Sequence, residues 1–294
     1  QNFELDHAWG HLGFVVEDSK LFDSFNYWQA GLEQEDGKVV AVGYSASTVH
    51  ESPQTFITLA RYKADGSLDK TFGGDSTTGS GYVTIKSEKS SLQAYAIVQD
   101  SDGNLYVGGN IFSGDPKNGA EYPLQIPFGP RPGVIHTPLS TRNFFLLKLD
   151  KEGKPVKGFG AEPITHDTGA LKTNFTGVTT NFNSAADAIL ALSIDAECKT
   201  ITAVGQASIG SAIEQMRTGA ARYFIKDGSL DASFGSSGKA TYEAGTKGQQ
   251  FGSAIVKPDA YQLVYVGQAT NGITNIFTGQ ENQNSTDLII AKLK

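Results

Sequence analysis

The chain has 294 residues and a net charge of −7, so it lacks the basic excess of a nucleic-acid binder, and we expect no nucleic-acid partner. Hydrophobic residues make up 39 %, enough for a core, while no apolar run approaches the ~18 residues of a membrane span. The single cysteine, Cys198, excludes an intrachain disulfide framework.

The start of the chain favours secretion. Gln1 is a residue that signal-peptide cleavage often leaves at a mature N-terminus, and a missing disulfide framework is only mild evidence against export. Two glycosylation sequons begin at Asn174 and Asn284, about as many as chance provides in a chain rich in Asn, Ser and Thr. We expect a secreted, extracellular glycoprotein whose signal peptide was removed ahead of Gln1.

Four segments share the pattern of a β-hairpin. In each, a short polar turn leads into β-branched or aromatic residues that end in glycine, and Asp36-Gly37 and Asp102-Gly103 supply the clearest turns. Each segment therefore predicts two antiparallel strands, A and B. The four segments are 31–43, 97–109, 192–205 and 255–267.

A second repeated element follows each hairpin. Its first three copies, 59–73, 147–160 and 221–235, each predict a strand C with one basic residue, a turn and a closing Phe-Gly. A short strand D follows at 81–85 and 238–242. The repeating unit is therefore four strands.

The fourth copy of this element is divided between the two ends of the chain. Residues 288–294 match strand C alone, while residues 4–10 and 13–16 match the turn and strand D. Joining the end to the start completes one unit, which makes physical sense if the structure closes and removes a sheet edge. We predict an all-β fold, a single closed four-bladed β-propeller whose last blade is completed by the N-terminal strand. The single domain spans 1–294, with blades of about 28–87, 93–166, 187–244, and 252–294 plus 1–17.

These residues resemble the delta-60 repeat family, whose units combine an Asp-Gly-Lys hairpin with Ala-Arg, Asp-Gly-Ser-Leu-Asp and Phe-Gly. Blades one and three match well from Arg61 to Gly73 and from Arg222 to Gly235, whereas blade two carries Lys148 and Pro155 at two family positions. The resemblance implies a propeller. It carries no shared catalytic motif, and a fold does not define a function.

The long and irregular connections between strands fall mostly on one predicted face of the propeller. Long, individual loops on a rigid scaffold usually carry binding or catalysis, although loop length can also drift on any exposed face. The insertion 111–143 holds six of the ten prolines, which favours a rigid wall or lid over the channel mouth; simple packing onto the blade is an equal alternative. The long connections are 45–55, 111–143, 167–186, 207–218 and 269–286.

One variable residue follows the glycine that ends each strand B. We expect these equivalent positions to surround the opening of the central channel. Their amide and phenol side chains can hydrogen-bond a neutral ligand there, or alternatively they can hydrogen-bond the backbone of the neighbouring loops. Trp28, at the start of a strand A, can stack on a sugar or belong to the core. The candidate ligand-binding residues are Tyr44, Asn110, Gln206, Gln268, Trp28, Tyr122, His136, Arg142 and Asp187.

No familiar catalytic motif occurs, so we name no catalytic residue and expect no cofactor and no metal. Three histidines in or beside the long loops, His50, His136 and His166, are weak metal candidates; solvated loop histidines are the commoner case.

The sequence predicts a secreted, monomeric ligand-binding propeller with one asymmetric pocket on the long-loop face. Its partner is a carbohydrate or another small polar or aromatic molecule. One alternative is an enzyme, a hydrolase, lyase or small-molecule cyclase, that uses the same pocket. A second alternative is a cell-surface interaction module.

Overall fold

The fold consists of strands and turns. Among the described residues there is no helix, and therefore none long and apolar enough to cross a membrane. The all-β prediction is confirmed for this part of the chain. The computed structural model of the protein describes residues 4–16, 24–47, 55–73, 80–87, 90–113, 141–167, 172–180, 182, 187–197, 199–208, 216–242, 250–255, 263–270 and 286–293.

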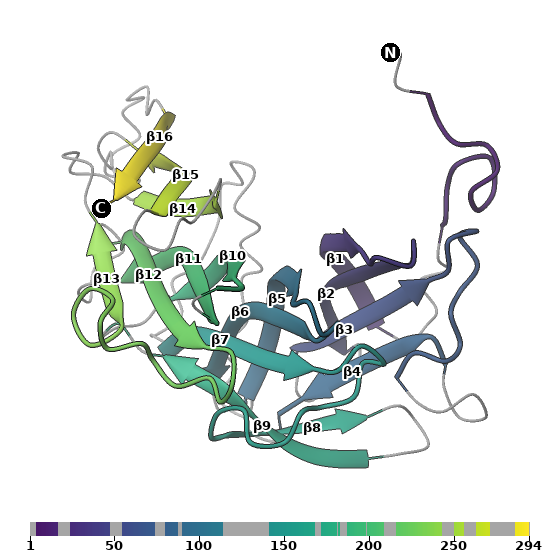
Figure 1. Ribbon diagram of the computed structural model, residues 1–294, viewed down its shortest axis with the longest axis horizontal. Helices are drawn as coiled ribbons and strands as arrows, with labels where there is room; N and C mark the ends of the chain where they lie inside the picture. Colours follow the sequence, from purple (N-terminus) through teal and green to yellow (C-terminus); the bar gives the residue numbers. More distant parts are fainter. Residues whose placement is uncertain are drawn as a thin grey trace, which may run out of the picture.

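Four antiparallel groups of strands follow one another along an arc (Figure 1), with β1, β5, β10 and β14 on its inner side. Blade one comprises β1 (Ser24–Glu33), β2 (Val39–Ser47), β3 (Thr55–Tyr62) and β4 (Tyr82–Lys86). Blade two contains β5 (Ser90–Gln99), β6 (Leu105–Ser113) and β7 (Thr141–Leu149). Blade three is β10 (Ala188–Asp195), β11 (Thr200–Ser208), β12 (Met216–Phe224) and β13 (Lys239–Tyr242). Blade four has β14 (Gln250–Ile255), β15 (Leu263–Thr270) and β16 (Thr286–Leu293).

A hairpin at the rim joins blades one and two, which the sequence did not predict. Its strands are β8 (Glu162–Asp167) and β9 (Lys172–Thr180). β8 pairs with β4 and β9 pairs with β7, so the two blades form one nine-stranded sheet. The predicted connection 167–186 therefore contains a strand, and the outer strand of blade two lies beyond residue 166. The reason is the threonine-rich sequence of β9, whose β-branched residues favour extended backbone despite their polarity.

Each inner strand bulges at the same repeat position. The register shifts between Trp28 and Ala30 in β1, and again at the equivalent points of β5, β10 and β14. The bulge drives a carbonyl oxygen against strand B: a Cβ on Gly43 would lie 1.8 Å from the Tyr27 oxygen, and one on Gly109 would lie as close to that of Gln93. The bulge therefore requires the glycine that ends each strand B motif.

Two apolar clusters fill the spaces between consecutive blades. Between blades one and two, Val42 and Ile57 pack with Leu92 and Phe145. A second cluster between blades two and three contains Phe144, Val178, Ile189 and Tyr223, among others. The inner strand of each later blade is thus packed against the blade before it.

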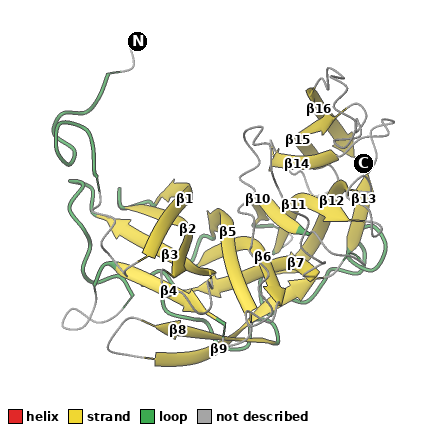
Figure 2. Ribbon diagram, turned by 180° about the vertical axis from the view of Figure 1, so that it is seen from behind, coloured by secondary structure: helices red, strands yellow, loops and turns green. Residues whose placement is uncertain are grey.

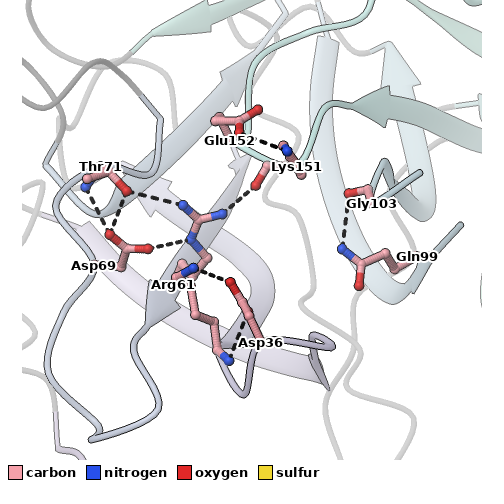
Figure 3. A network of polar contacts seen from close by, with 9 residues as sticks. Asp36, Arg61, Asp69, Thr71, Gln99, Gly103, Lys151 and Glu152 are labelled. Carbon is pink, nitrogen blue, oxygen red and sulfur yellow. Dashed lines mark hydrogen bonds and ion pairs between the residues drawn. The ribbon is translucent and has the colours of Figure 1, made fainter. Parts of the chain in front are cut away.

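A recurring contact joins the outer part of one blade to the C–D turn of the next, and Figure 3 shows it between blades one and two. The Gly73 N–H donates to the Glu152 carbonyl at 2.8 Å. Arg61 lies over the Phe72 ring at 4.6 Å, pairs with Asp69 through Nε and Oδ2 at 2.9 Å, and donates to the Lys151 carbonyl of blade two. Burial opposes ionisation of Asp69, but hydrogen bonds from Thr71 and the charge of Arg61 outweigh it and lower the pKa of that carboxyl.

The same contact recurs between blades two and three. The Gly160 N–H donates to the Asp227 carbonyl at 2.9 Å, and Lys148 Nζ donates to the Ile225 carbonyl at 3.4 Å. The strand C basic residue and the Phe-Gly glycine therefore form an interblade clamp, defined here as their hydrogen bonds to the following turn.

The N-terminal segment makes this contact too, but on blade one. The Gly10 N–H donates to the Asp65 carbonyl at 2.9 Å, and Val15 packs against Ala60, Tyr62 and Tyr82. Residues 4–16 thus lie where the outer part of a preceding blade belongs, as the split repeat requires.

The described residues do not show the predicted pairing of residues 13–17 with 288–294, which stays a prediction. β16 pairs there with β15 alone, and no sheet closes. Figures 1 and 2 show the N-terminal segment and β14–β16 at opposite ends of the arc.

The interblade clamp predicts a difference between two glycines with the same backbone conformation. Gly153 and Gly158 both have φ of +80°, but a Cβ on Gly153 would lie 2.7 Å from the Phe72 ring, whereas one on Gly158 meets no atom within 4 Å. Gly158→Ala should cost about 1 kcal/mol of unfolding free energy from backbone strain. Gly153→Ala should cost about 1–3 kcal/mol more through overpacking, measured by denaturant unfolding. Equal losses in the two variants would contradict the clamp.

Candidate functional site

The four variable positions after the strand B glycine are equivalent in the structure. Each pairs with the strand A residue that lies two positions before the unpaired residue of the β-bulge, at the inner side of the arc. The pairs are Tyr44 with Tyr27, Asn110 with Gln93, Gln206 with Ala188, and Gln268 with Phe251.

Tyr44 lies among aromatic rings where blades one and two meet. Its ring stacks on Tyr27 at a centroid distance of 5.0 Å and meets the edge of Tyr95 at 6.0 Å. Burial raises the pKa of Tyr44 well above its usual range, so its phenol is neutral at physiological pH. Tyr44 itself is 3 % exposed and belongs to the core, whereas Tyr27 and Tyr95 are half-buried, so the open part of this cluster belongs to those two rings.

Tyr95 is the residue at the β-bulge of β5, between the paired positions Ala94 and Ala96. Its hydroxyl donates to Gln93 Oε1 at 2.6 Å and hydrogen-bonds with the Asn110 side chain. Burial raises the pKa of Tyr95 to about 12, although the positive charge of Arg142 and the Asn110 hydrogen bond oppose the rise. The bulge thus turns this phenol toward a buried amide pair.

Asn110 carries the clearest sign of an incomplete site. The residue is 1 % exposed, and its Oδ1 has no hydrogen-bond partner among the described residues. A buried acceptor left unpaired costs about 1–3 kcal/mol, so such atoms are rare in native structures. A group that donates a hydrogen bond to this oxygen would remove the cost.

Two charged candidates lie beside this cluster and differ in use. Arg142, on β7, is half-buried, and its charge acts on both Tyr44 and Tyr95. Asp187 is fully buried, and its Oδ2 accepts the Phe182 N–H at 3.0 Å, while its own N–H donates to the Arg142 carbonyl at 3.1 Å. Asp187 therefore holds the entry into blade three, and its carboxylate is directed to backbone.

The structure does not bring all the sequence candidates together. Trp28 is 40 % exposed, and Gln206 is half-buried in blade three. Gln268 is placed by its backbone pairing, while its side chain lies outside the described residues. Tyr122 and His136 also lie outside the described residues, as does most of the insertion 111–143.

The metal candidates stay predictions. His50 and His136 lie outside the described residues, and His166 is in β8 with its side chain outside them. Within the described part of the chain, no three His, Cys, Asp or Glu side chains form a group that could hold a metal ion.

Sequence reasoning missed Tyr27 and Tyr95. Tyr27 directly precedes Trp28, and either one could have been chosen as the inward ring. Tyr95 stands one residue before the repeated alanine, Ala96, which is where every inner strand bulges. The extra residue of a bulge breaks the alternation from which side-chain direction is read, so that alanine was the available signal.

The raised pKa of Tyr95 predicts a loss of stability in alkali. Its native pKa lies near 12 and its unfolded pKa near 10, so the native state favours the neutral phenol. Stability from this group is present below pH 10 and falls between pH 10 and 12 by about 1.4 kcal/mol per pH unit. Tyr95→Phe should unfold with a shallower pH dependence in that range, measured by urea titration. Parallel curves for the two proteins above pH 10 would contradict this.

Comparisons with known proteins concern the fold more than the function. No curated protein sequence matches the chain. A crystal structure of an exo-1,5-α-L-arabinanase from a bovine ruminal metagenomic library aligns with it at a TM-score of 0.42 and 11 % identity, over 95 % of this chain and 80 % of that chain. At so low a TM-score the likeness carries no inference. Residues 34–72 match the family model for a domain of unknown function, DUF5122, described as a β-propeller. The resemblance to delta-60 repeats is thereby confirmed, and this stretch of the chain is a β-propeller repeat of that type.

Proposed function

We propose that the protein is a ligand-binding β-propeller with one site at the inner ends of blades one and two. The ligand is a carbohydrate or another small, polar, uncharged molecule. The observation that carries the proposal is the unpaired Oδ1 of Asn110, buried beside the Tyr95 phenol.

The chemistry of the described cluster suits such a ligand. The half-buried ring of Tyr27, stacked on the buried Tyr44, offers an aromatic face, and Asn110 offers an acceptor for a hydroxyl or amide N–H. Pockets with a few convergent polar groups in an apolar wall are the usual form of small-molecule sites.

One site is favoured over four because the repeat positions differ. Asn110 in blade two is replaced by Tyr44 in blade one and by Gln206 in blade three, and only Asn110 pairs with an amide, Gln93, across the strands. A multivalent lectin would need four similar sites. The proposal also includes the finer architecture. We propose that the four blades close into a ring, that the cluster borders the single mouth of this ring, and that the protein is a secreted monomer.

A binding role is preferred to an enzymatic one on the chemistry of the same cluster. Burial holds the Tyr44 and Tyr95 phenols in their neutral form, which suits hydrogen bonding and disfavours action as a general base near neutral pH.

The proposal predicts that Asn110→Ala weakens binding of neutral sugars. Wild-type protein would first be screened on an array of neutral mono- and oligosaccharides, and the ligand found would be titrated by calorimetry. Loss of one hydrogen bond that the ligand donates to the buried Oδ1 should weaken binding about tenfold.

Asn104→Ala is the matched control. Asn104 lies just before β6, at the other end of the same strand, where its amide hydrogen-bonds Asp100. This variant should bind like the wild type. The proposal fails if no neutral sugar binds, or if Asn104→Ala loses binding while Asn110→Ala keeps it.

A further inference from the structure

We infer that Tyr95 is a positioning residue. Through a directed chain of hydrogen bonds it turns the Asn110 amide so that Oδ1, and not Nδ2, meets the ligand. The site therefore selects a group that donates a hydrogen bond, such as a free hydroxyl, and rejects the corresponding ether. This inference rests on the proposed function, because it names the chemistry that the same site would accept.

The direction of the chain follows from the single proton of the Tyr95 phenol. That proton is donated to Gln93 Oε1 at 2.6 Å, so the phenol oxygen can only accept in its hydrogen bond with Asn110. The donor in the Asn110 side chain is Nδ2. This bond lowers the pKa of Tyr95, as a donor to the phenolate does. The hydrogen bonds therefore run from Asn110 Nδ2 to Tyr95 and on to Gln93.

This direction fixes the rotation of the Asn110 amide. The oxygen and nitrogen ends of an amide are nearly alike in shape, so the hydrogen-bond network decides which end lies where. With Nδ2 held by the phenol, Oδ1 is the end that faces away from Tyr95. It is also the atom that lacks a hydrogen-bond partner among the described residues, in a side chain that is 1 % exposed.

The backbone of blade two holds the three side chains in place. Gln93 lies directly opposite Asn110 across β5 and β6, and Tyr95 is the unpaired residue of the bulge two positions further along β5. Gln93 is buried, and the ring of Tyr95 meets the edge of Tyr44. Side chains fixed in this way can hold the amide in one orientation before a ligand arrives.

The chain of bonds is specific to blade two and is not part of the repeat framework. In the strand pairs that the structure describes, the equivalents of Tyr95 and Gln93 in the other blades do not supply the same groups. The unpaired bulge residue is Gln29, Leu190 or Ser253 in blades one, three and four, and the strand A partner is Tyr27, Ala188 or Phe251. A device found once in a repeat protein suits the single site proposed above.

The orientation of the amide determines which ligand groups are accepted. A hydroxyl or an N–H can donate to Oδ1 and satisfy it. An ether oxygen would instead set two acceptors against each other and leave Oδ1 unpaired, which should weaken binding about tenfold. Selection here depends on the direction of a hydrogen bond and not on size.

Heteronuclear NMR of the side-chain amides in isotope-labelled protein tests the chain of bonds without a ligand. Tyr95→Phe keeps the ring beside Tyr44 but removes the acceptor of Asn110 Nδ2, so the bonded N–H resonance of Asn110 should move upfield. Asn110→Ala assigns that resonance by its loss. The matched control, Tyr223→Phe, deletes a phenol that hydrogen-bonds Thr180 and should leave the Asn110 resonances in place. Unmoved Asn110 resonances in Tyr95→Phe, or movement of the Gln93 amide alone, would overturn the inference.

Ethylene glycol and its dimethyl ether test the selection itself. Both carry two oxygen acceptors, but only the glycol has hydroxyl donors. Titrated into the wild type, the glycol should shift the Asn110 amide resonances at about one tenth of the concentration that the ether requires. In Tyr95→Phe the amide can turn over, so this preference should fall to about one. Equal responses to the two probes in the wild type, or no response to the glycol, would overturn the inference.

The two proposals fail in different experiments. The proposed function fails if no neutral sugar on the array binds, whereas the role of Tyr95 fails on the amide resonances of the ligand-free protein.

Discussion

One hydrogen bond recurs between the blades and sets their arrangement: the N–H of a glycine that follows Phe or Trp donates to a carbonyl in the C–D turn of another blade. It is made by Gly10, Gly73 and Gly160. The turn must then carry a glycine of its own, because a side chain at Gly66 or Gly153 would collide with the docked Trp9–Gly10 or with Phe72. Two motifs that lie close together within a repeat, the turn glycine (Gly66 or Gly153) and the Phe-Gly glycine (Gly73 or Gly160), are therefore parts of one contact between neighbouring repeats.

The blades were predictable from sequence because their signals are local. Asp36-Gly37 and Asp102-Gly103 specify hairpin turns by themselves, and the spacing between copies reveals the repeat. The β8–β9 hairpin was missed because its strands lie outside the repeat and are polar, and because β8 pairs with a strand of the other blade. Long-range pairing of this kind leaves no periodic trace within a single repeat.

The candidate site was partly predictable for the same reason. Tyr44 and Asn110 were found because a glycine marks their position in every blade, whereas Tyr95 depends on an irregularity of backbone geometry. A ligand-binding role for Asp187 stays a prediction; the structure adds its bond to the Phe182 N–H, a backbone group that no side-chain pattern reveals. The amino-acid composition shows which side chains are available for a site, whereas the β-bulges of the inner strands determine which of those side chains lie next to each other.

The nine-stranded sheet constrains how such a chain can evolve. Repeat proteins commonly change length by duplicating or deleting a unit, which requires each unit to be separable from its neighbours. Blades one and two share the β8–β9 hairpin, so removing either one would leave the other with an unpaired rim. Blades one and two are therefore a single unit of hydrogen bonding, whereas blade three, with the order β10-β11-β12-β13, is a sheet of its own.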